Sequence, residues 1–180
     1  VFNQDKNTTL VAVNLLYEIG AKHEDDDATG FAHLFEHLMF SGSKNFENYD
    51  QIVERLGGES NAFTNNDITN YYLSVPNIYL QYALDLEADR MQNLNLNQKS
   101  LDVQKSVVIE EFKQRYINQP YGDLWKEIRQ LSFTLHPYQH QTIGKCIEHI
   151  ENVSLERAKQ FYENYYTPSN AILAISGNVE

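Results

Sequence analysis

The sequence predicts an α+β fold: a two-layer domain in which helices cover a mostly antiparallel sheet. Three observations support this class. Alternating apolar and polar residues indicate an early strand, a central pair of strands around a polar turn, and a closing strand. Helical patterns fill the chain between the strands, and in the second half they follow one another. Such grouping of helices apart from hairpin-like strands is typical of α+β domains.

The first half of the chain combines one strand, two helices and a hairpin. Val11, Val13, Leu15 and Tyr17 alternate with other residues and fall on one face of the predicted strand. The hairpin turn is predicted at Asn65-Asn66-Asp67, since these residue types favour turns. In chain order we expect a strand at Thr8–Gly20, helices at about Phe31–Phe40 and Phe46–Gly58, and two strands within Glu59–Val75.

The second half is mostly helical. Pro120 separates two helical patterns, because proline lacks a backbone donor and its ring clashes with the preceding turn. The apolar run AILAIS near the end predicts the closing strand. In chain order we expect helices at Ile78–Leu94, about Ser100–Asn118, about Tyr121–Phe133 and Ser154–Tyr165, and then a strand at Ala171–Ser176.

Composition limits the classes of partner. The chain has 180 residues and a formal net charge of −11, which argues against the basic surface that nucleic-acid binding requires. No run of about 18 uninterrupted apolar residues appears, so no membrane-spanning helix is expected. The single cysteine, Cys146, cannot form a disulfide framework. Part of the acidity lies in His23–Asp27, HEDDD, which we interpret as a solvated loop.

The stretch GFAHLFEHLMFSGS, residues 30–43, contains the pattern most indicative of chemistry. His33 and His37 are four residues apart, so on a helix both imidazoles lie on one side and can bind a single zinc ion. Glu36 flanks the same point, where a carboxylate can take a proton from a water molecule. The pattern HLFEH is the inverted form of the zinc-peptidase motif H-E-x-x-H.

The alternative is an ordinary histidine pair, either on the surface or hydrogen-bonded inside the core. Apolar residues share the same helical turns, among them Leu34, Phe35 and Leu38. Burying three polar groups without partners in such surroundings would cost several kcal/mol. A metal ion, or a wet cleft built for one, removes this cost, and we prefer that interpretation.

A catalytic zinc site needs a third protein ligand and keeps its fourth position open. The predicted helix at about Ser100–Asn118 offers Glu110 and Glu111. Adjacent helical residues diverge by about 100° around the axis, so only one of the two can face a given ion. Helical periodicity leaves the choice between them open, and an exposed glutamate pair is the alternative for both.

Five segments together resemble a known family. In order they are GFAHLFEHLMFSGS, GGESNAFTNNDITNYYLSV, QKSVVIEE, HPYQHQTIG and YTPSNAILAISGNV. The set resembles the N-terminal catalytic domain of the pitrilysin–insulinase family of zinc peptidases, which includes the mitochondrial processing peptidases. We therefore expect residues 1–180 to form a single N-terminal metallopeptidase-like domain, truncated at both ends and lacking the second homologous domain found in the family.

The resemblance implies a role for each residue of the motifs. His33 and His37 would be zinc ligands, and Glu36 the general base. Glu111 would be the third ligand, because it closes the family pattern V-V/I-x-x-E. Gln104 stands where the family commonly has a glutamate, seven residues before this ligand. A neutral amide can hydrogen-bond beside the site but holds no charge near the zinc, so we expect slower turnover with the metal site retained.

The resemblance also implies a substrate and a partner. An extended peptide would pair with the strand that contains Asn61, Ala62 and Phe63, although these residues taken alone indicate only an ordinary edge strand. We expect a zinc metalloendopeptidase that hydrolyses peptide bonds through a metal-activated water and needs a second homologous domain or partner subunit for full activity. The alternative is a non-catalytic substrate-binding or structural subunit of the same family. Such members lose the metal motif, which this chain retains.

Overall fold

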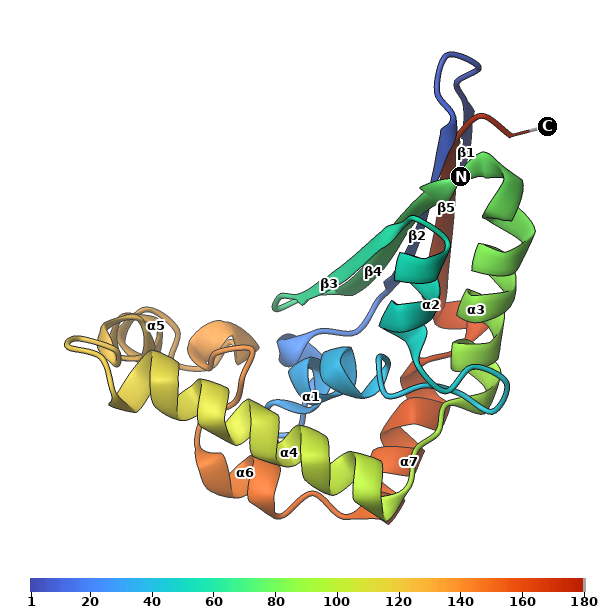
Figure 1. Cartoon of the computed structure of the whole chain (residues 1–180). Coiled ribbons are helices and arrows are strands. Elements are labelled where there is room, and N and C mark those ends of the chain that lie inside the picture. Colours follow the sequence, from blue (N-terminus) through green and yellow to red (C-terminus); the bar gives the residue numbers. More distant parts are fainter. Residues whose placement is uncertain (180) are drawn as a thin grey trace.

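The computed structural model describes residues 1–179, and it has the α+β architecture that the sequence predicts. One five-stranded sheet lies against the helices in this part of the chain (Figure 1). The strand order is β1-β5-β2-β4-β3, and only β1 and β5 run parallel to each other. The strands are β1 at Phe2–Gln4, β2 at Leu10–Tyr17, β3 at Glu59–Thr64, β4 at Thr69–Pro76 and β5 at Ala171–Gly177.

The hairpin between β3 and β4 turns where the sequence predicts. Asn65 Oδ1 accepts hydrogen bonds from the backbone N–H groups of Asp67, at 2.7 Å, and Ile68, at 2.9 Å. Asparagine side chains form such turns readily because they imitate a backbone carbonyl. The sequence does not predict β1, because all three of its residues are exposed and show no alternation. Pairing with β5 alone makes this segment a strand.

The helices within residues 1–179 largely follow the predicted order. The helix expected at about Ser100–Asn118 divides into α4 and a π-helical turn at Lys113–Ile117. The five-residue α6 was not predicted, since it is shorter than two helical turns. None of the helices in the described part of the chain has the length and apolar character needed to cross a membrane. The helices are α1 at Phe31–Leu38, α2 at Tyr49–Arg55, α3 at Leu80–Asn93, α4 at Gln98–Phe112, α5 at Leu124–Ser132, α6 at Ile147–Glu151 and α7 at Leu155–Tyr165.

Two apolar clusters join the helices to the inner face of the sheet. At one end, Val11 and Val13 of β2 pack with buried residues of α2 and α3. At the other end, Leu15 and Tyr17 of β2 pack with α1, α4 and α7. Helix α1 contacts β3 and β4 on one side and α4 on the other, and so lies between the sheet and α4 (Figure 1). The core therefore fixes α1 at the centre of the molecule.

The inward face of α3 buries a charged pair. Arg90 is 1% exposed, and its Nε donates to Glu87 Oε2 at 2.8 Å. Tyr49 of α2 donates its hydroxyl to Glu87 Oε1 at 2.5 Å, and the Arg90 guanidinium lies 4.4 Å from the centre of the Tyr49 ring. Buried charges are tolerated only when they are paired and hydrogen-bonded in this way. The cluster thus ties α2 to α3 beneath the sheet.

Candidate active site

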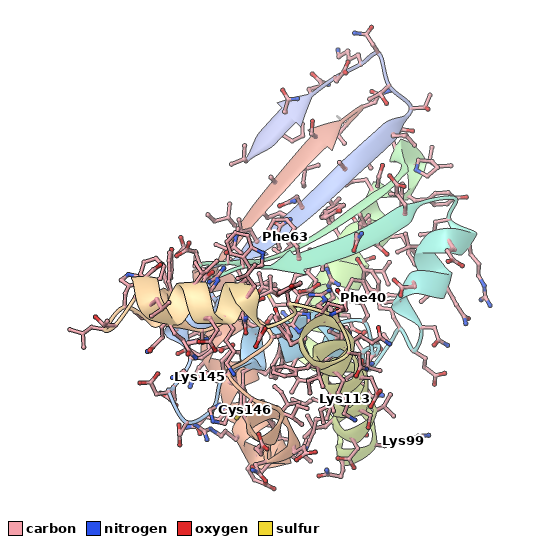
Figure 2. The ribbon with its side chains drawn as sticks, turned by 90° about the vertical axis from the view of Figure 1, so that its left-hand side faces the viewer. Phe40, Phe63, Lys99, Lys113, Lys145 and Cys146 are labelled. Atoms are coloured by element: carbon pink, nitrogen blue, oxygen red, sulfur yellow. The ribbon has the colours of Figure 1, made fainter. Side chains whose placement is uncertain are left out.

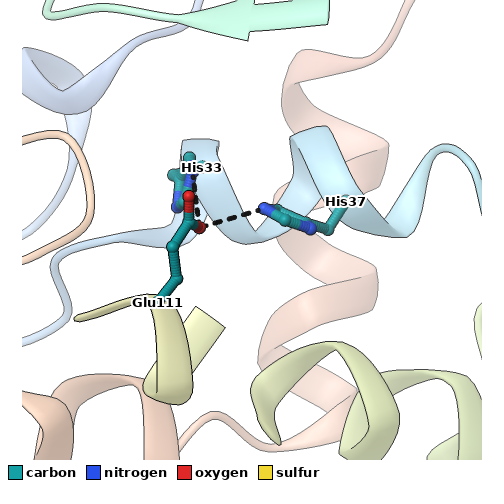
Figure 3. A group of neighbouring side chains, drawn as sticks. All are labelled: His33, His37 and Glu111. Carbon is teal, nitrogen blue, oxygen red and sulfur yellow. Dashed lines mark ion pairs between the residues drawn. The ribbon is translucent and has the colours of Figure 1, made fainter. Parts of the chain in front are cut away.

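Helix α1 presents His33 and His37 on one side because its other side is apolar. Leu34, Phe35 and Leu38 are buried in the core, at 1% exposure or less. The histidines lie in the same turns but on another side of the helix, which faces α4 (Figure 3). The spacing of four residues predicted this shared side, and the structure confirms it.

The N-terminus of α1 is capped by Glu24. Its carboxylate oxygens accept hydrogen bonds from the backbone N–H groups of Gly30, at 2.7 Å, and Ala32, at 2.8 Å. Gly30 has a φ of 95°, a conformation that favours glycine. The interpretation of His23–Asp27 as a solvated loop is therefore wrong for Glu24, which satisfies backbone donors that a helix start leaves unpaired.

Helix α4 directs Glu111, and not Glu110, toward the histidines. Val108 and Phe112 are buried against the core, which sets the rotation of the helix. Glu110 then falls on the solvent side, where Lys113 Nζ contacts its Oε1 at 2.6 Å. The packing of α4 resolves a choice that periodicity alone leaves open.

The three side chains converge on one point. Glu111 Oε2 lies 3.5 Å from His33 Nε2 and 3.5 Å from His37 Nε2 (Figure 3). One ligand atom from each residue lies within 4.8 Å of the other two. In a tetrahedral site with zinc about 2.05 Å from each ligand, the ligand atoms would be about 3.3 Å apart. The observed spacing therefore fits a zinc ion.

The electrostatics of the site agree with metal binding. Burial, together with the nearby His37 and Arg115, lowers the pKa of His33 to about 3, so its imidazole is neutral as a metal ligand must be. Glu111 Oε2 is buried and has no hydrogen-bond partner among the described residues. Leaving a buried carboxylate oxygen unpaired is costly, and a bound cation would remove that cost.

Comparisons with known proteins identify the family of this chain. Residues 1–143 match the model of the insulinase family, peptidase family M16. The chain belongs to this family. It is 36% identical to the zinc protease PqqE of Helicobacter pylori over 97% of its own length and 40% of that protein. A crystal structure of a protease from Helicobacter pylori superposes with a TM-score of 0.91, at 36% identity, over 96% of this chain and 42% of that one.

A more distant relative is a mitochondrial protein. The probable β subunit of the mitochondrial processing peptidase of Arabidopsis thaliana is 25% identical over 93% of this chain and 32% of that protein. The resemblance to the pitrilysin–insulinase family that the sequence shows is therefore confirmed. This chain spans about 40% of the length of the relative from Helicobacter pylori.

The other predicted site residues lie on α1, α4 and β3. Glu36 is half-buried on α1, immediately before His37. Gln104, on α4, donates from Nε2 to Ser41 Oγ at 3.3 Å. That contact joins α4 to the segment that follows α1.

The predicted substrate strand is β3, at the edge of the sheet. Within residues 1–179 it pairs only with β4, so its other edge is open to this part of the chain. Asn61 and Phe63 are exposed, whereas Ala62 is half-buried against the core. Figure 2 shows Phe63 on this strand; its side chain is 45% exposed. Asn61 Oδ1 accepts the backbone N–H of Ala62 at 2.8 Å.

The sequence does not predict the contacts of two residues near the site. No sequence pattern links Glu24 to a helix start six residues later, so the sequence places its side chain in a solvated loop. Arg115 forms an ion pair with Glu111 Oε1. Its position four residues after Glu111 could have indicated the contact, since charges at this spacing are neighbours on a helix.

Proposed function

We propose that this protein is a zinc-dependent peptidase that hydrolyses peptide bonds. The observation that carries the proposal is the convergence of His33, His37 and Glu111 from two helices into one group of ligand atoms. Membership of family M16 and similarity to a zinc protease support it. Glu111 is the third ligand in this proposal, because Glu110 is exposed and pairs with Lys113.

The chain supplies the groups that a metal-assisted hydrolysis needs. Zinc, when bound, supplies Lewis acidity, which lowers the pKa of water and stabilises negative charge on a carbonyl oxygen. Glu36 is the general base: its carboxylate accepts a proton from the attacking water and then delivers it to the leaving amine nitrogen. Glu36 suits this role because it lies about 100° around the helix from His37. Its carboxylate is therefore next to the proposed zinc ligands without being one of them.

The substrate in this proposal is an extended peptide that adds to the open edge of β3. Backbone pairing gives affinity without demanding a particular sequence. The N–H of Ala62 donates to the side chain of Asn61, so it is directed toward the open edge, where a peptide carbonyl can replace that amide oxygen as its acceptor. Asn61 and Phe63 lie on either side of Ala62, where they can contact the peptide.

A second homologous domain or partner subunit completes the binding site in this proposal. The chain covers 40% of the relative from Helicobacter pylori and 32% of the one from Arabidopsis thaliana, which is itself described as a subunit. The open edge of β3 supports the idea, because a peptide bound there would be covered by this chain on only one side.

Substitution of Glu36 tests the proposal. Glu36→Gln should keep about one zinc per chain, measured by atomic absorption, because the ligands are unchanged. Cleavage of an unstructured peptide by the protein of natural length should fall by about 10²–10⁴-fold, the usual contribution of a general base. His33→Ala is the control that should lose the zinc itself. A wild-type protein that holds no zinc under saturating conditions would contradict the proposal and favour a non-catalytic subunit.

A further inference from the structure

Arg115 contacts the one oxygen of Glu111 that does not face the histidines. Its guanidinium Nη2 forms an ion pair with Glu111 Oε1. The other oxygen, Oε2, lies 3.5 Å from both histidine Nε2 atoms. The two oxygens of a single carboxylate are thus divided between an arginine and the metal ligands.

The fold places Arg115 where it can do this. It lies in the π-helical turn Lys113–Ile117, which directly follows α4 and in which Asn118 N–H bonds the carbonyl of Lys113 at 2.8 Å. The Arg115 side chain is 55% exposed and that of Glu111 is 24% exposed. The arginine therefore covers the solvent side of the carboxylate without being fixed in the core.

We infer that Arg115 is a positioning residue that makes Glu111 a ligand through one oxygen only. A carboxylate can bind a metal through one oxygen or through both, and zinc sometimes expands from four ligands to five. The ion pair directs Oε1 toward Arg115 and away from the histidines, which favours coordination through Oε2 alone. A metal bound by His33, His37 and Oε2 would then have four ligands, the fourth being water, and binding of the second oxygen as well would make five. The inference rests on the zinc site of the proposed function.

A neighbouring ion pair provides a matched control. Lys113 pairs with Glu110 on the same stretch of helix, and both of these side chains are at least 41% exposed. Exposed ion pairs of this kind contribute little to stability, so loss of Lys113 should leave the fold intact. Removing Lys113 takes away the same charge as removing Arg115, close to the same site. Only Arg115 touches an oxygen of the proposed ligand.

The number of ligands can be measured with Co²⁺ in place of zinc, because cobalt in a four-coordinate site absorbs visible light more strongly than in a five-coordinate one. The samples are the wild-type protein of natural length, Arg115→Met and Lys113→Met. In Arg115→Met, Glu111 is free to bind through both oxygens. We expect its visible absorbance per bound cobalt to fall by about twofold or more, at about one cobalt per chain, since geometry determines these spectra. Lys113→Met should keep the wild-type spectrum.

Two results would overturn this inference but leave the proposed function intact. One is a wild-type spectrum in Arg115→Met, and the other is an equal change in Lys113→Met, which would indicate a general effect of lost charge. Circular dichroism of each variant confirms that the fold is retained. A wild-type protein that takes up no Co²⁺ or Zn²⁺ would instead overturn the metal site, and the proposed function with it.

Discussion

Glu110 and Glu111 show how one residue of difference changes the role of a side chain. Both are glutamates of α4, but their surroundings differ. Glu110 is exposed and pairs with Lys113. Glu111 is half-buried, and one of its oxygens faces His33 and His37. The rotation of α4, set by its buried residues, decides which glutamate meets the histidines.

Substitution of each glutamate by alanine should separate the two roles. Glu111→Ala should weaken zinc affinity by more than about 100-fold, because losing a ligand should exceed the 10–100-fold typical of losing a partner of a ligand. Glu110→Ala should leave the affinity within about threefold of the wild type, since its ion pair is exposed. Competition with a chromophoric chelator measures both. Equal losses in the two variants would contradict the assignment of Glu111.

Among the elements, α1 is held at several points along its length. Glu24 caps its N-terminus, and Gly30 provides the turn into it. The hydroxyl of Tyr71, on β4, donates to the carbonyl of Phe35 at 3.2 Å, midway between the two histidines in sequence. These contacts keep the histidines in place before any metal binds, so the chain loses little entropy on binding one.

Removal of the Glu24 cap should therefore destabilise the whole domain. Glu24→Ala should lower the free energy of unfolding by about 1–2 kcal/mol, because two backbone donors lose their acceptor. Asp25→Ala is a fair control: Asp25 belongs to the same acidic loop, but its side chain is exposed and, among the described residues, forms an ion pair only with Arg157. The Asp25→Ala substitution should change the free energy of unfolding by no more than about 0.5 kcal/mol. Urea unfolding measures both, and similar losses would show that Glu24 is an ordinary loop residue.

At the scale of the whole molecule, the candidate site is open to solvent on one side. The histidines belong to α1, which lies between the sheet and α4, and β3 has a free edge beside it (Figure 1). An open cavity next to His37 and Glu111 is lined by Ser106, Val107 and Gln114 of the α4 region. A peptide placed between β3 and α4 would keep a face exposed to solvent. Exposure of this kind leaves bulk water in contact with the reacting groups, which weakens the electrostatic interactions among them.

Residues 1–180 expressed alone should therefore bind zinc but cleave peptides weakly. The three proposed ligands all lie within this segment, so about one zinc per chain is expected. The kcat/KM for an unstructured peptide should be at least about 100-fold below that of the natural-length protein, because positioning of a substrate contributes factors of this size. Equal activity in the two forms would show that this domain needs no second one.

The sequence by itself determined the local structure and the kind of chemistry. The alternation in β2, the turn at Asn65 and the spacing of His33 and His37 all depend on patterns within a few residues. Helices repeat every 3.6 residues and strands every two, so such patterns are visible without a fold. The α+β class, the metal motif and the family followed from them.

Only the tertiary structure decided which groups meet. The selection of Glu111 over Glu110, the contact of Arg115 and the cap by Glu24 depend on how one element is rotated against another. The same holds for β1, which is a strand only because β5 lies beside it. These choices minimise the free energy of packing across segments that are distant in the chain. No local window of residues contains that information, because the helix faces become distinct only when they are buried.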